Sequence, residues 1–539
     1  MQQSDGAPPE VWGGIECSHV LIRGENRDQC LEGGHDGREG DLEQIAELGI
    51  RVLRYPLLWA KADLDWHAPR LERLRQLGIT PIVGFVHHGS GPGGIGPDEP
   101  AFASGLGDFA ETVARRFPWI THFTPLNEPV TTARFGYLYC HWHPHARSRR
   151  RFLRAIVGSA LATAEAMDCI RRHIPAAELV QTEDLGRVFS VPRLADQAHY
   201  ENERRFLCFD LLSGWVDAGH AFHAELIAAG VDPAALERLA AAPCPPDVIG
   251  VNHYLTSDRF LDTRLRRYPG ERVGGNGRQR YVDVAAARVP EVGPETGPLA
   301  RLLEVHARYG RPVALTEVHN GCTREEQLRW LAECWTAAKA ARAEGVDVRA
   351  LTVWSLFGSI DWNTLLAERR GHYESGAFDT RSGAPRATAV AQAVAALIRD
   401  GEFDHPVLAG KGWWHAAETP SGPCLRLLGI EAGVRAVEAC AGRRRLPVCH
   451  DAPPWPGVWG TLVAHEAGYR FTAADGPVLQ VELPPGADRE AAANAVLDLA
   501  IDGASGLFRL SAIGPHNQYL AEAVEEAAPP PRRARAARP

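Results

Sequence analysis

Eight short apolar runs, each followed by residues with helical spacing, constrain the fold of this chain of 539 residues more than any other feature. Apolar strands that alternate with helices are typical of parallel sheets, and eight such strands close a (β/α)₈ barrel. The runs occupy residues 11–15, 52–57, 81–86, 120–125, 178–182, 248–254, 312–317 and 350–356. We therefore predict an α/β protein whose main domain is a (β/α)₈ TIM barrel.

The stretches between the runs carry helix signals, which agrees with this pattern. Residues 102–117 have apolar side chains at helical spacing, and residues 151–173 form a long Ala-rich stretch. Thr323, followed three residues later by Glu326, predicts a capping box at the start of a helix that runs to Gly345.

The rest of the chain divides into segments of different composition. We assign residues 11–400 to the barrel and residues 401–423, rich in Gly, Pro and Trp, to a linker. Residues 424–525 alternate between helix-like and strand-like stretches, which predicts a second, smaller α/β domain at the C-terminus. We predict disorder at residues 1–10 and at the Pro-, Ala- and Arg-rich residues 526–539.

Composition and charge argue against several classes of function. The formal net charge is −9 with no basic stripe through the main body, so we expect no nucleic-acid partner. We expect no membrane association, since no apolar run is long enough to span a bilayer, and we find no secretory signal. The 11 cysteines are scattered without metal-ligand spacing, which predicts reduced thiols, a cytoplasmic location and no metal site.

Two glutamates end separate predicted strands of the barrel. Glu128 lies in the segment Thr-Pro-Leu-Asn-Glu-Pro at 124–129, and Glu317 ends the run at 312–317. The C-terminal ends of barrel strands meet at one mouth, where this fold places its chemistry. Two carboxylates at one mouth are the minimum equipment for hydrolysis of a glycosidic bond, one as acid/base and one as nucleophile.

Each glutamate also has a structural interpretation. A general acid needs a pKa raised by burial and by a nearby negative charge, which a second carboxylate gives Glu128, while Asn127 can bind a sugar hydroxyl. The Asn-Glu-Pro tripeptide is equally compatible with a turn, because Pro ends a strand. Glu317 is compatible with a salt-bridged strand end, and Arg54 serves either that ion pair or an ionised nucleophile.

Other predicted strand ends carry polar or aromatic side chains. A sugar site needs polar groups that bind hydroxyls and an aromatic platform for the C–H faces of the ring. Taken singly, each such residue is more often structural, but together at one mouth they favour a sugar site. The set consists of His87, Asn252, Tyr254, Trp354, Asp361 and Trp362.

The order of these motifs resembles that of glycoside hydrolase family 1, the β-glucosidase type, over residues 11–397. The T-x-N-E-P-like motif of the family matches residues 124–129, which implies that Glu128 is the acid/base. The T-E-N-G-like motif is matched in part at Glu317, which implies the nucleophile. An R-x-S-x-x-W-like motif matches Arg54 and implies that this arginine holds the nucleophile.

Further motifs of the resemblance imply the sugar-binding set. The segment Gly-Val-Asn-His-Tyr at 250–254 falls on the family's G-x-N-Y-Y motif, so that Tyr254 is expected to touch the nucleophile. The family's sugar-binding His falls on His87. The family's W-S-x-x-D-N-x-E-W segment falls on residues 354–362. The substrate ligands implied in this way or by position are His87, Asn127, Asn252, Trp354, Asp361 and Trp362.

The chain also departs from the family pattern in the part that binds the sugar. The early sugar-binding Gln has no clear equivalent, and Glu16 or His19 lies nearby instead. Asp361 stands where the family has a Glu, and Val-His replaces Asn-Gly after the nucleophile. A preference for glucose is therefore not expected.

A second resemblance concerns the C-terminal part. Residues 12–17, 87–92 and 181–186 look like a bacterial subgroup of family-1-like proteins that often carries a fused domain similar to dTDP-4-dehydrorhamnose reductase. Residues 495–508 resemble the end of such a reductase. No glycine-rich dinucleotide loop opens this region, and the last lysine of the chain is Lys411, so the reductase's Tyr-x-x-x-Lys pair is missing. We therefore predict a degenerate, reductase-like remnant.

The sequence thus predicts a retaining β-glycosidase that hydrolyses O-glycosidic bonds of a carbohydrate or glycoside through a covalent glycosyl-enzyme, without metal or organic cofactor. Two other functions remain open at this point. One is a catalytically weak barrel that binds sugars, which the altered sugar-binding part allows. The other is a sugar-nucleotide oxidoreductase, by way of the C-terminal resemblance.

Overall fold

The computed structural model describes residues 8–415, 422–450, 457–474, 476, 478–513 and 518–524. The chain divides into two compact units, Met1–Glu418 and Thr419–Pro539. The predicted disordered tail at 526–539, and residues 1–7 of the predicted disordered N-terminus, lie outside the described residues.

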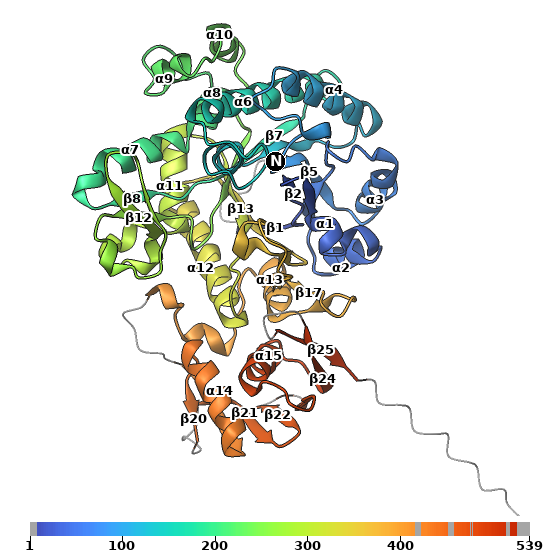
Figure 1. Ribbon diagram of the computed structural model, residues 1–539. Helices are drawn as coiled ribbons and strands as arrows, with labels where there is room; N and C mark the ends of the chain where they lie inside the picture. The colour runs from blue at the N-terminus through green and yellow to red at the C-terminus, as the bar shows by residue number, and fades with distance from the viewer. Residues whose placement is uncertain are drawn as a thin grey trace, which may run out of the picture. The chain divides into compact units, whose positions relative to one another are not determined.

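The first unit is a closed barrel of eight parallel strands (Figure 1). Around the barrel the strands follow the order β1, β14, β13, β9, β7, β6, β5 and β4. In chain order they are β1 (Glu10–Gly14), β4 (Val52–Pro56), β5 (Thr80–His87), β6 (His122–Asn127), β7 (Glu178–Asp184), β9 (Val248–Asn252), β13 (Val313–Val318) and β14 (Val348–Val353). Each of the eight predicted runs falls on one of them, so the predicted (β/α)₈ barrel is confirmed.

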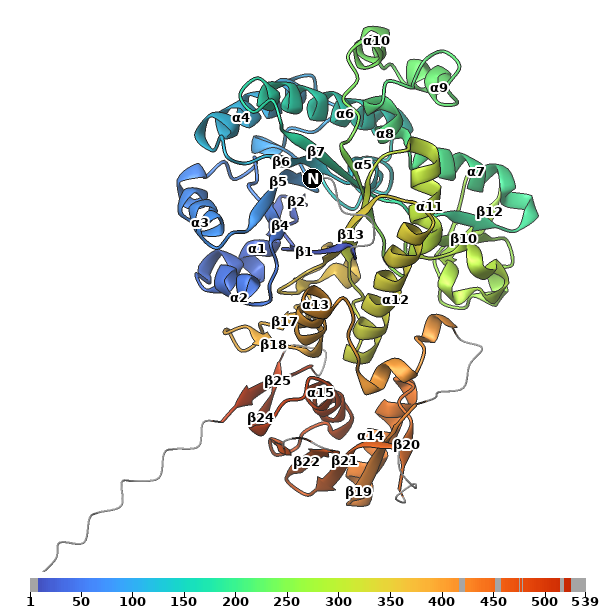
Figure 2. The ribbon, with the colours of Figure 1, turned by 180° about the vertical axis from the view of Figure 1, so that it is seen from behind.

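Helices surround the barrel strands, as both ribbon views show (Figures 1 and 2). The longer ones are α3 (Leu64–Gln76), α4 (Ala101–Arg116), α6 (Arg149–Arg171), α11 (Pro298–Tyr309), α12 (Arg324–Ala343) and α13 (Ala389–Asp400). The shorter ones are α1 (Gln29–Glu32), α2 (Asp41–Glu47), α5 (Pro129–Ala133), α7 (Ala195–Arg204), α8 (Leu207–Leu212), α9 (His223–Ala228) and α10 (Pro233–Ala241). The predicted helices at 102–117 and 151–173 correspond to α4 and α6.

The predicted capping box at the start of α12 is wrong in its side-chain contacts. Thr323 occupies the N-cap position, but its hydroxyl makes no capping hydrogen bond to a backbone N–H of the helix. It donates instead to the carboxylate of Glu325. The neighbouring acid therefore competes for the hydroxyl, which a sequence pattern cannot reveal.

Insertions between the barrel elements form small sheets of their own. The hairpin of β2 (His19–Ile22) and β3 (Glu25–Asp28) follows β1. A four-stranded sheet beside α7 combines β8 (Val188–Ser190), β10 (Arg259–Asp262), β11 (Val273–Gly275) and β12 (Arg280–Ala285) (Figure 2). Two-stranded sheets pair β15 (Ser359–Ile360) with β16 (Tyr373–Glu374) and β17 (Phe378–Asp379) with β18 (Arg386–Ala387).

A layer of apolar side chains fills the N-terminal half of the barrel. Because side chains alternate along a strand, each strand sends some residues inward, and those near the strand starts meet there. The layer consists of Trp12, Ile82, Val180, Val248, Ala314 and Ala350, all buried. These apolar side chains close the N-terminal end of the barrel. The polar side chains at the C-terminal strand ends form the mouth, where a binding site can lie.

The described part of the predicted linker packs against α12. Two single turns of 3₁₀ helix lie here, Pro406–Ala409 and Trp413–His415. Arg329 of α12 donates to the carbonyl of Val407 at 3.0 Å, and Trp414 donates through Nε1 to Glu333 at 2.7 Å.

In its described residues the second unit contains a mixed sheet of seven strands with two helices, which confirms the prediction of a smaller α/β region at the C-terminus. The sheet order is β20, β19, β21, β22, β23, β24 and β25. The strands are β19 (Cys424–Gly429), β20 (Val448–Cys449), β21 (Val458–His465), β22 (Gly468–Ala473), β23 (Val478–Glu482), β24 (Gly506–Ile513) and β25 (Gln518–Ala523), and the helices are α14 (Glu431–Arg443) and α15 (Arg489–Ile501). The two helices pack against each other and against strands of the sheet.

No helix within the described ranges is long and apolar enough to cross a membrane. Among the same residues, no group of three or more His, Cys, Asp or Glu side chains is arranged to hold a metal ion.

Candidate active site

Glu128 occupies a sharp turn at the end of β6. Its backbone has φ 48° and ψ 62°, the left-handed region, which is uncommon for a residue with a side chain and costs roughly 1–3 kcal/mol. Its N–H donates to the carbonyl of Thr182 on the neighbouring β7 at 3.2 Å. The turn buries the carboxyl at the barrel mouth, where the residue is 5% exposed.

Glu183, the next residue of β7, holds this turn in place. Its carboxyl oxygens accept from the backbone N–H groups of Val130, at 2.8 Å, and of Thr131, at 3.2 Å, in the first turn of α5. Burial raises the pKa of Glu183 to about 8, although both N–H groups oppose that shift. Glu183 therefore supports the backbone that presents Glu128, a task that the sequence alone did not assign to it.

Glu317 is bound from two sides at the end of β13. Arg54, at the end of β4, donates through Nη1 to Glu317 Oε1 at 2.8 Å and to the carbonyl of Thr316 at 2.7 Å. The hydroxyl of Tyr254 donates to Glu317 Oε2 in a short hydrogen bond. Burial and the charge of Glu317 raise the pKa of Tyr254 well above its ordinary value, so the phenol keeps its proton and acts as a donor.

Two asparagines connect these groups to Glu128. Asn127 Oδ1 accepts from Arg54 Nη2 at 2.7 Å and from the Thr182 hydroxyl at 2.6 Å. Asn252 donates through Nδ2 to Glu128 Oε1 at 2.6 Å, and its Oδ1 accepts from the hydroxyl of Thr316 at 2.7 Å. One hydrogen-bonded network therefore spans both carboxylates, and it fixes the orientation of both amides.

The two carboxyls differ in what surrounds them. Burial, followed by the charge of Glu317 and then those of Asp184 and Glu183, raises the pKa of Glu128 well above its ordinary value. Burial also raises the pKa of Glu317, but the Arg54 guanidinium and the Tyr254 hydroxyl oppose that rise. The pair therefore holds its proton on Glu128 and its charge on Glu317, the division that a general acid and a nucleophile require.

His87 and Trp354 form a stacked pair beside this network. Their rings lie 5.2 Å apart between centroids with an interplanar angle of 8°, and the Arg54 guanidinium lies 4.7 Å from the Trp354 ring. Burial lowers the pKa of His87 well below its ordinary value, so the ring is neutral. Because Asn127 Nδ2 donates to His87 Nε2 at 3.2 Å, the ring proton lies on Nδ1. The Nδ1–H is therefore the donor of the His87 ring.

Asp361 and Trp362 lie differently from the other predicted ligands. Asp361 Oδ2 accepts from Arg27 Nη2 at 3.0 Å and from the N–H of Arg370 at 3.0 Å, while its Oδ1 accepts from the N–H of His372 at 2.8 Å. Both carboxylate oxygens therefore have partners within the chain. Trp362 is half-buried and packs edge-on against Trp142.

Two more residues of the mouth escaped the sequence-based site. Glu16, two residues after β1, is 5% exposed, and its Oε2 accepts from Trp354 Nε1 at 3.2 Å. His88 approaches Glu128 Oε2 to 3.9 Å through Nε2, and burial lowers its pKa to about 3. The signal for both was a polar residue just beyond the end of an apolar run. His88 directly follows His87, and Glu16 lies near the position at which the resemblance implies a sugar-binding Gln.

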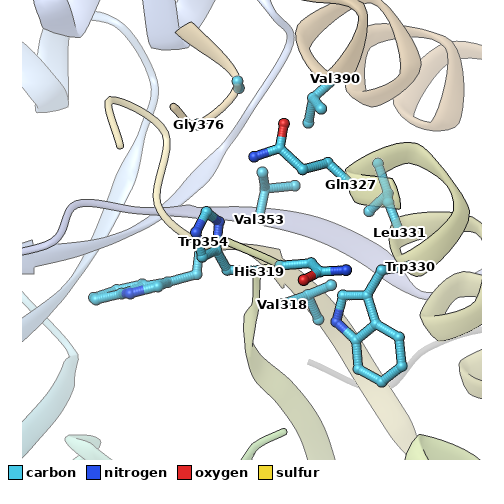
Figure 3. Close-up of a pocket in the computed structure, with 11 residues that line it drawn as sticks. Val318, His319, Gln327, Trp330, Leu331, Val353, Trp354, Gly376 and Val390 are labelled. Carbon is cyan, nitrogen blue, oxygen red and sulfur yellow. The ribbon is translucent and has the colours of Figure 1, made fainter. Parts of the chain in front are cut away.

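A pocket also lies beside the end of β13, lined by Trp354, His319 and Trp330, by the amides Asn320 and Gln327, and by small or apolar residues (Figure 3). Neither Glu128 nor Glu317 is among its lining residues. The pocket offers no carboxylate pair, so we place the candidate active site at the two glutamates.

Comparison with known proteins finds similarity to β-glucosidases, in agreement with the pair of buried carboxyls. No family model matches the chain. A bifunctional β-D-glucosidase/β-D-fucosidase of Bifidobacterium breve is 24% identical over 425 residues, which cover 68% of this chain and 88% of that protein. A coniferin β-glucosidase of Pinus contorta is 23% identical over 420 residues, covering 67% of this chain and 81% of that protein.

Solved structures share the fold. The β-glucosidase from Thermotoga maritima in complex with cyclophellitol aligns with a TM-score of 0.60 at 17% identity, over 74% of this chain and all of that one. The sequence and fold matches together make the chain a distant homologue of β-glucosidase-like proteins of glycoside hydrolase family 1. None of these relatives is named as a reductase, so the predicted reductase fusion gains no support from them.

The support that Glu183 gives to the Glu128 turn can be tested by stability. In Glu183→Ala the N–H groups of Val130 and Thr131 lose their buried acceptors, which we expect to lower the free energy of unfolding by about 2–4 kcal/mol. Glu183→Gln keeps one acceptor oxygen and should cost less. Urea denaturation measures both, with Glu178→Ala, a partly exposed residue at the other end of β7, as the control. Equal midpoints for all three variants would contradict this role.

Proposed function

We propose that the barrel is a retaining β-glycosidase that hydrolyses O-glycosidic bonds. The observation that carries the proposal is the asymmetry of the two carboxyls: Arg54 and Tyr254 bind Glu317, while burial and the charge of Glu317 keep the proton on Glu128. Distant homology to β-glucosidases supports the same reaction class.

In the first step Glu317 attacks the anomeric carbon of the glycoside, and the bond from that carbon to the leaving oxygen breaks. Glu128 gives its proton to this oxygen, so the leaving group departs as a neutral alcohol and the glycone remains on Glu317 as an ester. As the charge of Glu317 disappears into the new bond, Arg54 stays bound to the carbonyl of Thr316 and to Asn127. The arginine therefore stays in position throughout the step.

In the second step the ionised Glu128 takes a proton from water, and the water oxygen attacks the anomeric carbon. The ester bond breaks, Glu317 regains its charge between Arg54 and Tyr254, and the sugar leaves with its original anomeric configuration. Asn252 donates to Glu128 Oε1, which stabilises the ionised form in which Glu128 acts as base. The two-carboxylate mechanism proceeds without a metal or an organic cofactor.

The remaining mouth residues supply the sugar-binding groups of the proposal. The Nδ1–H of His87 donates to a hydroxyl, and Trp354 and Trp362 provide aromatic surface for the C–H face of the glycone. Asn127 and Asn252 lie next to the reacting carboxylates, within reach of hydroxyls near the anomeric centre. Asp361 is the weakest candidate, because Arg27 and two backbone N–H groups already bind it.

Observations on the chain weigh against the two other functions. A barrel that only binds sugars has no need to hold a charged carboxylate next to a protonated one, and both are costly to bury. A reductase needs a glycine-rich turn between its first strand and helix. Here β19 ends at Gly429, and the next glycine, Gly433, already lies in α14. All 11 cysteines are free thiols, which fits the cytoplasmic location that we also propose.

The covalent intermediate offers the first test. Incubation with a panel of aryl 2-deoxy-2-fluoro β-glycosides should add the mass of one glycosyl unit to the wild-type protein, as seen by intact-mass spectrometry. Glu317→Gln should show no adduct, because the amide is not a nucleophile. Glu374→Gln, a half-buried carboxylate that pairs with His319 instead, is the control and should still be labelled. An adduct on Glu317→Gln, or inverted product in an NMR time course, would exclude the proposed nucleophile or mechanism.

The acid role of Glu128 predicts a dependence on the leaving group. In Glu128→Gln, kcat/KM for an unactivated alkyl glycoside should fall by about 10²–10⁴-fold, because no proton reaches the departing oxygen. The loss should be far smaller for a 2,4-dinitrophenyl glycoside, whose leaving group needs no proton. Steady-state kinetics on the two substrates measures the difference. The same loss on both would mean that Glu128 acts by some means other than proton donation.

The contact between Asn252 and Glu128 predicts a shift in the pH profile. The Asn252 amide donates to the Glu128 carboxylate and so lowers its pKa; without it, in Asn252→Ala, that pKa should rise further. Since the acid must be protonated, the high-pH limb of kcat/KM should move to higher pH, whatever happens to the maximum. Asn202→Ala, whose amide binds the backbone of Val188, serves as control. A limb that stays or moves to lower pH would contradict the assignment.

A further inference from the structure

Glu16 is a third buried carboxyl of the barrel mouth, and the proposed reaction does not use it. Its Oε1 accepts from the N–H of Ser18 at 2.9 Å and its Oε2 from Trp354 Nε1 at 3.2 Å. The same Trp354 ring stacks on His87 and lies under the guanidinium of Arg54. Glu16 therefore lies at the edge of the proposed sugar platform and not in a separate part of the fold.

Glu16 lacks a cationic partner. Among the described residues it forms no ion pair, and the basic groups of the mouth are engaged elsewhere. Arg54 binds Glu317 and Asn127, and Arg27 binds Glu32 and Asp361. A buried carboxylate without a cation is costly, because neutral N–H donors replace only part of its hydration.

The surroundings of Glu16 also leave hydrogen-bonding capacity unused. Each carboxylate oxygen can accept two hydrogen bonds, and each oxygen of Glu16 accepts one of those described above. The Ser18 hydroxyl and the Trp362 indole N–H have no partner with hydrogen-bond geometry within the described residues, yet both lie close enough to Glu16 to lower the pKa of that carboxyl. The donors around Glu16 are therefore all neutral, and two of them make no well-formed hydrogen bond to it.

The charges of the other mouth residues indicate which charge a partner of Glu16 should carry. Glu16 and Glu317 are acidic, Glu128 holds its proton, the rings of His87 and His88 are neutral, and Arg54 is the cation that binds into this network. Asp184 adds a further acid near Glu128. One positive charge on the ligand side would balance Glu16, as Arg54 balances Glu317.

We propose that Glu16 selects a glycone that carries a basic amino group, whose ammonium binds the Glu16 carboxylate beside Trp354 and Trp362. This inference rests on the proposed glycosidase function and names the substrate class of the same site. An ammonium supplies three donors, enough for the spare acceptors of Glu16, and a charge-assisted hydrogen bond is roughly twice as strong as a neutral one. Burial raises the pKa of Glu16, and a bound ammonium would favour its ionised form.

The test compares amino and neutral sugars on matched variants. The substrates are 2,4-dinitrophenyl β-glucosides with an amino group in place of the hydroxyl at C3, C4 or C6, with their N-acetylated forms and the unsubstituted glucoside. For wild type, kcat/KM for at least one amino sugar should exceed that of the neutral sugar by about 10-fold or more. Glu16→Gln, which keeps size and one acceptor but no charge, should abolish that ratio. Glu374→Gln should retain it.

Binding separates this inference from the proposed reaction. Quenching of tryptophan fluorescence by the corresponding methyl amino-glycosides needs no turnover, and it is measured on wild type, Glu16→Gln and Glu317→Gln. Binding that depends on Glu16 but not on Glu317 supports the inference, even if no glycoside is hydrolysed and the proposed function fails. Equal amino-to-neutral ratios in wild type and Glu16→Gln overturn the inference and leave the glycosidase function intact. An N-acetylated sugar that binds as well as its free amine would also overturn it.

Discussion

The hydrogen bonds of Arg54 hold the candidate site together. One guanidinium on β4 reaches Glu317 and the Thr316 carbonyl on β13 and Asn127 on β6, so it joins three strands that are far apart in the sequence. A buried arginine is stable only where its donors are paired, and here the partners are a carboxylate, an amide and a backbone carbonyl. Removal of any one of them leaves a buried charge short of a partner. The position of the proposed nucleophile and that of the residue before the proposed acid are therefore set by one side chain.

The proposed division of labour follows from how the two glutamates are surrounded. Glu317 has a cation and a phenol hydroxyl as donors, whereas Glu128 has one amide donor and lies near acidic neighbours. Both are similarly buried, so desolvation alone does not decide which of them holds the proton. The neighbours decide it. The left-handed backbone of Glu128 and the two N–H groups bound by Glu183 add a structural cost at the same residue, as expected where geometry serves chemistry.

The barrel could be predicted from the sequence because strand-length apolar runs and helical spacing are local signals, and their number fixed the architecture. The convergence of Glu128, Glu317, Arg54 and Tyr254 followed from their positions at or near strand ends, together with the family resemblance. Contacts between side chains could not be predicted. Nothing in the sequence indicates that Glu325 captures the Thr323 hydroxyl, or that Arg27 binds Asp361 across more than three hundred residues. Glu183 and Asp361, like the proposed catalytic acids, are acidic residues at or after predicted strand ends. Only the groups that they bind distinguish them from Glu128 and Glu317.

Arg27 has a further consequence for how a sugar can be bound. An aspartate is one methylene shorter than a glutamate, and at position 361 it is held by Arg27 and by the N–H groups of Arg370 and His372, in a residue whose own φ is +60°. The charge of Asp361 is therefore neutralised within the protein by Arg27. Its two carboxylate oxygens also bind backbone N–H groups of the loop at 370–372, which fixes their orientation. Glu16 is the opposite case, since it is similarly buried but bound by neutral donors alone. Glu16 is thus the carboxyl without a cationic partner at the proposed sugar-binding end of the mouth. A ligand bound beside Glu16 would contact a carboxyl group where the resemblance implies the amide of a Gln. The charge of the ligand would therefore affect how well it binds.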